Sequence, residues 1–99
     1  MEILHIATPD EWADAQRTGQ VTPAGLASEG FVHCSTRGQL AGTLDLVFRG
    51  AGPLVVLVLE SDDFDDVRWE GDPVAFPHVY SAIPTTAVKA TEDVTAPGG

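Results

Sequence analysis

The chain has 99 residues, of which 43% are hydrophobic and 20% charged, and its formal net charge at pH 7 is −10. This length and composition predict one soluble globular domain and exclude a second domain or an extensively disordered chain. Five lysines and arginines cannot build the basic surface that a nucleic acid or an anionic membrane requires, so neither partner is expected.

Neither a membrane span nor a targeting segment is expected. The longest apolar run, residues 54–59, is strand-sized, whereas about 18 apolar residues are needed to cross a bilayer. Residues 1–5 lack the basic and apolar regions of a signal peptide, and a single cysteine, Cys34, cannot form an internal disulfide. These features predict a protein of the reducing cytoplasm.

The N-terminal part has the pattern of a strand followed by a capped helix. Residues 2–7 are expected to form the strand. Thr8 can cap the helix, Pro9 suits its first position, and Glu11 completes a capping box. The helix is expected to run to about Arg17.

A helical turn over 24–28 and a strand over 31–34 precede a second main helix, about 37–48. The apolar residues of that helix recur at three- and four-residue spacing and predict one buried face, made of Leu40, Leu44 and Val47.

Strands dominate the rest of the chain. Residues 54–59 are apolar at every position, which predicts a central strand buried on both faces. After an acidic loop or turn over 61–66, short strands are expected over residues 67–70, 78–80 and 87–91. Early helices followed by late strands predict an α+β fold with two main helices. The globular domain is expected over 1–93, with a flexible tail over 94–99.

Each of the three histidines lies in a short strand-type segment. Side-chain alternation places His5 opposite Leu4 and Ile6, so that it faces solvent or a cleft. A hydrogen-bonded structural role is the alternative for His5. Zinc is not expected, because the histidines have no tight helical spacing and no Cys-x-x-Cys accompanies them.

Four consecutive polar or thiol residues, His33-Cys34-Ser35-Thr36, lie where a strand runs into a helix start. Amide groups and hydroxyls at such a place can bind an anion, which makes Ser35 and Thr36 candidate ligand-binding residues and His33 a candidate catalytic residue. Alternatively, Ser35 or Thr36 only caps the helix and His33 fills a niche in the core. Cys34 is either a nucleophile with a lowered pKa or, as is usual for a lone cysteine in a strand, buried packing.

Two further pairs of residues share a strand face. Arg68 and Glu70 form one pair, and His78 and Tyr80 the other. Glu70 and His78 are candidate catalytic acid–base residues, and Arg68 and Tyr80 are candidate ligand-binding residues. The alternative for Arg68 and Glu70 is an ordinary cross-strand ion pair.

In this order, the motifs resemble a bacterial family described as domain of unknown function 952. The resemblance covers about residues 3–90 and rests on His-Ile-Ala-Thr at 5–8, Gly-Phe-Val-His-Cys-Ser-Thr at 30–36, Arg-Trp-Glu at 68–70 and Phe-Pro-His-Val-Tyr at 76–80. It implies a fold related to ADP-ribosyltransferases, with a split antiparallel sheet around a cleft that holds NAD in active relatives.

The resemblance also implies roles for individual residues. His5 is similar to a first-strand histidine that binds the ribose or nicotinamide part of NAD. His33 and Ser35 resemble the His-x-Ser stretch of RNA 2′-phosphotransferases. The late catalytic glutamate of such enzymes has no clear counterpart here, and Glu70 is the candidate.

The sequence therefore predicts a small cytoplasmic protein, monomeric or homodimeric, with a histidine-lined cleft for a nucleotide-like or other small anionic ligand. An ADP-ribosyltransferase-like enzyme or its degenerate relative, with NAD as the candidate cofactor and no metal, is the first hypothesis. Two alternatives stay open: a lyase, isomerase or cyclase that uses His33 or His78 without NAD, and a non-enzymatic binding module.

Overall fold

A computed structural model describes residues 1–98 of the chain. Its helices are α1 (Pro9–Thr18), α2 (Ala24–Glu29) and α3 (Leu40–Val47), with 3-10 turns η1 (Arg37–Gln39), η2 (Ser61–Asp63) and η3 (Thr85–Ala87). Its strands are β1 (Glu2–Ala7), β2 (Gln20–Val21), β3 (Val32–His33), β4 (Pro53–Glu60), β5 (Val67–Glu70), β6 (Phe76–Val79), β7 (Ile83–Pro84) and β8 (Ala90–Thr95).

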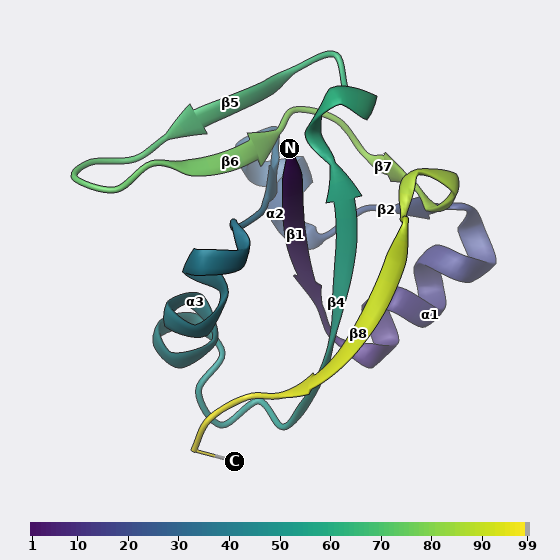
Figure 1. Cartoon of the computed structure of the whole chain (residues 1–99). Helices are drawn as coiled ribbons and strands as arrows, with labels where there is room; N and C mark the ends of the chain where they lie inside the picture. The colour runs from purple at the N-terminus through teal and green to yellow at the C-terminus, as the bar shows by residue number, and fades with distance from the viewer. Residues whose placement is uncertain (99) are drawn as a thin grey trace.

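The apolar strand β4 lies at the centre of the main sheet, whose order is β1-β4-β8 with both neighbours antiparallel to it (Figure 1). Leu57 and Leu59 point into one hydrophobic cluster, and Leu54 and Val56 point into another. The prediction of a central strand buried on both faces is confirmed, because alternate side chains of an extended chain fill the two faces in turn.

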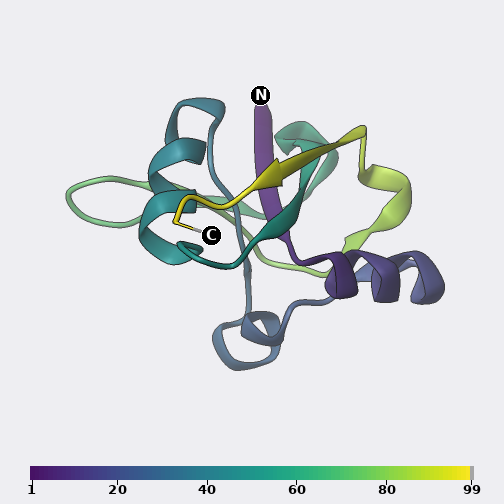
Figure 2. The same cartoon turned by 90° about the horizontal axis from the view of Figure 1, so that it is seen from below.

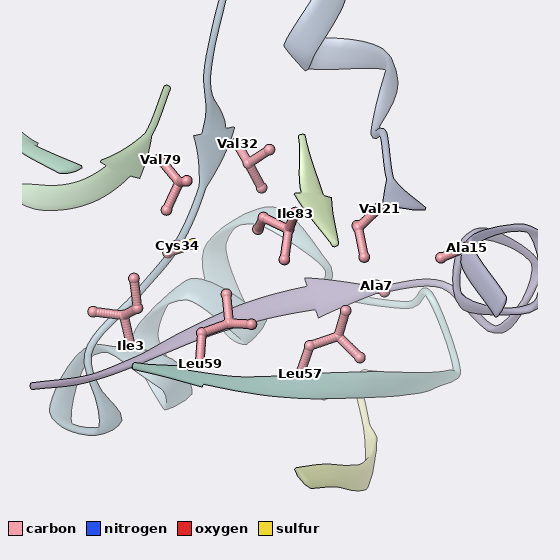
Figure 3. Close-up of a cluster of buried hydrophobic side chains, with 10 residues drawn as sticks. All are labelled: Ile3, Ala7, Ala15, Val21, Val32, Cys34, Leu57, Leu59, Val79 and Ile83. Carbon is pink, nitrogen blue, oxygen red and sulfur yellow. The ribbon is translucent and has the colours of Figure 1, made fainter. Parts of the chain in front are cut away.

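The larger cluster lies between the main sheet and the elements β2, β3, β7 and α1 (Figure 3). Helix α1 contributes Ala15, and the partly buried Trp12 packs against the same cluster. Gly19 ends the helix in a left-handed conformation, with φ of 88°, which glycine adopts without steric cost.

The smaller cluster joins the opposite face of the sheet to α3. Leu40, Leu44 and Phe48, which are four residues apart, make the helix contact. The predicted inclusion of Val47 in this face is wrong, because Val47 is 66% exposed. The helix side chains that are four residues apart lie along the sheet, whereas the Val47 side chain points away from it.

The remaining strands form a second three-stranded sheet, β3-β6-β5, and the two-stranded pair β2-β7, all antiparallel. A single bridge between Leu4 and Ser35 joins β1 to the chain just after β3. Helices α1 and α3 lie at opposite sides of the molecule (Figures 1 and 2). The molecule is therefore α+β with small antiparallel sheets, as predicted.

The C-terminal part differs from the prediction. The last strand runs over Ala90–Thr95, not 87–91, because η3 occupies the start of the predicted segment. The expected tail over 94–99 begins too early: Val94 packs in the smaller cluster, Ala96 is buried, and the Ala96 N–H donates to Gly52 at 2.9 Å. Pairing with β4 orders this segment. Residue 99 lies outside the described residues.

Within the described residues, 1–98, the helices are all too short or too polar to cross a membrane.

Candidate functional site

Three predicted site residues form a row across the β3-β6-β5 sheet. His33 of β3 lies directly opposite His78 of β6, and His78 lies directly opposite Arg68 of β5. Residues opposite one another in antiparallel strands project from the same face of the sheet. Strand pairing thus brings together side chains that are up to 45 residues apart in the sequence.

Aromatic and imidazole rings pack together on this face. The ring of Phe31 stacks on His78, with centroids 4.0 Å apart and planes 13° from parallel. His33 meets His78 edge to face at 5.1 Å, and Phe31 lies 5.2 Å from Tyr80. These contacts hold the His78 ring in one orientation. We call Phe31, His33, Glu70, His78 and Tyr80 the imidazole cluster.

Glu70 is the hydrogen-bond acceptor of the imidazole cluster. Its Oε1 accepts a hydrogen bond from His78 Nδ1 at 2.9 Å and another from the Tyr80 hydroxyl. The bond from Tyr80 and then that from His78 lower the pKa of Glu70 below its usual value, because both stabilise the carboxylate. The same contact raises the pKa of Tyr80. Glu70 is thus an ionised acceptor at neutral pH.

The bond to Glu70 fixes which nitrogen of His78 is available. A carboxylate accepts only, so Nδ1 carries the proton. Within residues 1–98, Nε2 of His78 has no hydrogen-bond partner, and no polar side-chain atom there is both sealed from solvent and unpartnered. Nε2 therefore reaches solvent, and in the neutral ring it holds a free lone pair.

Arg68 lies over the Tyr80 ring, with the guanidinium carbon 4.0 Å from the centroid. Its guanidinium also donates two hydrogen bonds to Asp66, at 2.9 and 3.0 Å. These bonds lower the pKa of Asp66 and raise that of Arg68. A bidentate pair of this kind satisfies the guanidinium, so Arg68 must leave Asp66 before it can bind a ligand anion.

His5 contacts the imidazole cluster through the main chain of His33 and not through its side chain. It is only 5% exposed. Its Nδ1 bonds the main-chain carbonyl of His33 at 2.8 Å, and its Nε2 bonds Glu11 Oε1 at 2.8 Å. Since Glu11 turns to His5, only half of the predicted capping box forms: the Glu11 N–H donates to Thr8 Oγ1 at 3.1 Å.

Ser35 and Thr36 serve local structure. Ser35 is buried, and its hydroxyl bonds that of Thr43 at 3.1 Å. Thr36 and Gln39 form a complete capping box around η1, with both bonds present. The predicted helix 37–48 is thus η1 followed by α3, and the Thr36 and Gln39 N–H groups at its start are already bonded.

Cys34 is buried, and burial raises the pKa of its thiol to about 12. A lowered pKa is what a cysteine nucleophile needs at neutral pH. The core-packing alternative therefore describes Cys34, whose side chain belongs to the larger hydrophobic cluster (Figure 3).

Sequence reasoning did not select Phe31, Glu29 or Asp66 as neighbours of the site. Glu29 Oε1 bonds the exposed His33 Nε2 at 2.9 Å. Glu29 and His33 are four residues apart in the sequence. This spacing predicts a side-chain contact only where both residues belong to one helix. Here the chain turns at Gly30 between α2 and β3, so the contact depends on that turn.

The imidazole cluster lies outside two hollows of the surface. One, of about 210 Å³, runs along α1 and β2 and includes Glu11. The other, of about 440 Å³, lies against β4 and β8. Neither hollow includes a residue of the imidazole cluster. No group of three His, Cys, Asp or Glu side chains arranged to hold a metal ion occurs in the part of the chain that the structure describes.

Comparison with known proteins identifies the family. The model of a family described as protein of unknown function DUF952 matches residues 6–91, which is most of the chain. The chain belongs to the DUF952 family. The resemblance drawn from the motifs is thereby confirmed for the family.

Solved structures of another protein resemble this DUF952 chain closely. The crystal structure of protein CC0527 from Caulobacter crescentus has a TM-score of 0.86 and 30% identity, covering 94% of this chain and 85% of that chain. Its solution NMR structure has a TM-score of 0.83 and 30% identity, covering 95% and 84%. A comparison with curated proteins gave no match. Protein CC0527 thus shares the fold of this DUF952 chain.

Proposed function

We propose that the imidazole cluster is a small-molecule site in which His78 transfers a proton and Glu70 orients its ring. The observation that carries the proposal is the bond from His78 Nδ1 to Glu70. A carboxylate that holds one nitrogen leaves the other directed outward as a base, and imidazole suits this role at neutral pH.

Two features of the cluster support acid–base chemistry. The ring of His33 lies 5.1 Å from that of His78, so a second imidazole, whose Nε2 bonds Glu29, lies beside the first. The His33 side chain is 60% exposed, which lets it exchange protons with solvent. One imidazole can accept a proton while the other donates one, as isomerisation, elimination and cyclisation require.

The charges around the cluster favour an uncharged polar ligand. Glu29, Glu70 and Asp66 supply three carboxylates, and Arg68 is paired with Asp66. A free anion would meet these carboxylates before it met an unpaired cation. We therefore place the ligand among neutral hydroxy or carbonyl compounds, and not among the small anions that the sequence favours.

The second candidate is NAD-type nucleotide binding with an ADP-ribosyltransferase-like fold. The split antiparallel sheets and the place of His5 on the first strand favour it. Against it, both nitrogens of His5 and the Ser35 hydroxyl already have partners inside the protein. A nucleotide would have to displace these bonds at a cost of about 1–3 kcal/mol for each buried group left unpaired.

An NMR titration of the whole chain tests the proposal. Amide and imidazole signals are followed while NAD, ADP-ribose and a panel of neutral sugars and hydroxy ketones are added. We expect a neutral compound to shift the signals of Phe31, His33, His78 and Tyr80 saturably, and the His78→Ala variant to lose this response.

The Glu2→Gln variant is the matched control, because Glu2 lies on β1 and bonds Arg37 away from the cluster. It should bind like the wild type. Shifts centred on His5 and Ser35 with NAD would favour the second candidate. No saturable response at the cluster with any compound of the panel would overturn the proposal.

A further inference from the structure

Strand β5 is the outermost strand of its sheet and lies at the rim of the molecule (Figure 1). Two main-chain hydrogen bonds show which residues of β5 direct their N–H and carbonyl groups toward β6. The Tyr80 N–H donates to Asp66 O at 2.9 Å, so the residue just before β5 bonds toward β6. The Pro77 carbonyl accepts from Cys34, so Pro77 bonds toward β3 and away from its partner Trp69.

Hydrogen-bonded and non-bonded residues alternate along an antiparallel strand. Arg68 and Glu70 therefore bond β6, like Asp66 before them. Val67 and Trp69 direct their N–H and carbonyl groups to the free edge. Such an edge can accept a further strand.

Within β5, the side chains on either side of Trp69 are self-complementary. Trp69 is a large hydrophobic residue that is 44% exposed to solvent. A cation, Arg68, precedes it and an anion, Glu70, follows it. An edge with like charges would repel a copy of itself. This edge presents opposite charges placed symmetrically about the tryptophan.

We propose that β5 pairs antiparallel with β5 of a second copy of this chain, about a two-fold axis at Trp69. In this register the two Trp69 residues exchange main-chain hydrogen bonds and cover each other's rings. Arg68 of each copy lies opposite Glu70 of the other in a non-hydrogen-bonded pair, in which the Cα atoms are about 4.5 Å apart. The interface is isologous, as a two-fold dimer requires.

The pairing brings a group from the second copy to the imidazole cluster. Glu70 projects from the same face as His78 and bonds it. When Arg68 of the second copy leaves its own Asp66, it can approach that carboxylate and strengthen the hold of Glu70 on His78. The dimer itself does not depend on the role proposed for His78, because it rests on the edge alone.

The short contact predicts a weak dimer. Strand β5 has four residues, and such a contact is well below the area of stable interfaces, so we expect a dissociation constant of about 10 μM to 1 mM. Each copy carries a net charge of −10, and the resulting repulsion also limits affinity.

Sedimentation equilibrium of the full chain tests the proposal over concentrations from about 20 μM to about 1 mM. We expect the mean mass to rise from monomer toward dimer. The Trp69→Lys variant should stay monomeric, because lysine at an edge opposes pairing. Its NMR spectrum shows whether it remains folded.

The matched control is Leu46→Lys. Leu46 is also a solvent-facing hydrophobic residue, 87% exposed, but lies on α3. This variant should dimerise like the wild type. A monomeric wild type at the highest concentration, an unchanged dimer in Trp69→Lys, or a dimer lost in Leu46→Lys would each overturn the proposed edge.

Exchanging the charges of Arg68 and Glu70 tests the proposal without altering Trp69. Arg68→Glu places like charges opposite each other at two places and should weaken the dimer about tenfold or more. The double variant R68E/E70R restores opposite charges in the same register and should recover it. A double variant as weak as Arg68→Glu would contradict pairing about Trp69.

Discussion

The ring of His5 bonds the main-chain carbonyl of His33 across 2.8 Å, although 28 residues separate the two. Its other nitrogen bonds Glu11 in the first turn of α1. A single buried imidazole thus ties β1, the end of β3 and α1 together. The two histidines differ in role: His5 stabilises the scaffold, and His33 lies on the surface of the imidazole cluster.

Replacing His5 by alanine should destabilise the fold. The change removes two hydrogen bonds, to the His33 carbonyl and to the partly exposed Glu11 carboxylate, and each contributes about 0.5–1.5 kcal/mol. Urea unfolding followed by tryptophan fluorescence measures the free energy of unfolding.

His33→Ala is the comparison for His5→Ala. The His33 side chain is exposed and its main chain is unchanged by the substitution, so the free energy of unfolding should stay within about 0.5 kcal/mol of wild type. Equal losses in the two variants would show that His5 does not have the structural role assigned to it.

The neutral His78 ring should carry its proton on Nδ1. Glu70 accepts from that nitrogen, whereas Nε2 reaches solvent. Long-range proton–nitrogen correlation spectra distinguish the two tautomers directly. In Glu70→Ala, the preference should fall toward that of a free imidazole. A wild-type ring protonated mainly on Nε2 would remove the basis for His78 as an outward-facing base.

Tyr80, the one tyrosine of the chain, should ionise above the ordinary phenol pKa of 10.0. The main cause is its hydrogen bond to Glu70, followed by burial. Because the folded pKa is raised, this bond stabilises the protein below about pH 10, the unfolded value. That stabilisation is lost as the pH rises through the folded pKa.

Absorbance of the tyrosinate reports Tyr80 alone, since tryptophan does not ionise in this range. Glu70→Gln should lower the midpoint, because the phenolate then no longer faces a carboxylate. Glu92→Gln is the control: Glu92 bonds Arg37, and its loss should leave the midpoint unchanged. Equal midpoints in the wild type and Glu70→Gln would contradict the Glu70–Tyr80 contact.

The thiol of Cys34 should be inert in the folded protein. It is buried, and its pKa is raised to about 12, so little thiolate forms near neutral pH. Ellman's reagent at pH 8 should react only after urea is added. Fast reaction of the folded chain would show that Cys34 is accessible.

Local patterns were enough to predict several elements. The apolar run of β4 and the Thr8-Pro9 start of α1 appear where the sequence predicts them. Each depends on residues close in the chain, whose spacing fixes either a cap or two buried faces. By contrast, β2, β7 and the end of β8 have weak patterns of their own, and they are ordered by their partners in pairing.

The sequence by itself determined the family, the α+β class, the central strand and the polar residues worth considering as a site. Only the tertiary structure decided which of these residues meet. Strand register brings His33, His78 and Arg68 into one row, while His5 and Ser35 turn inward to internal partners. Pairing between distant strands, and the requirement that buried polar groups find hydrogen-bond partners, set these positions. Neither can be read from the spacing of neighbours along the chain.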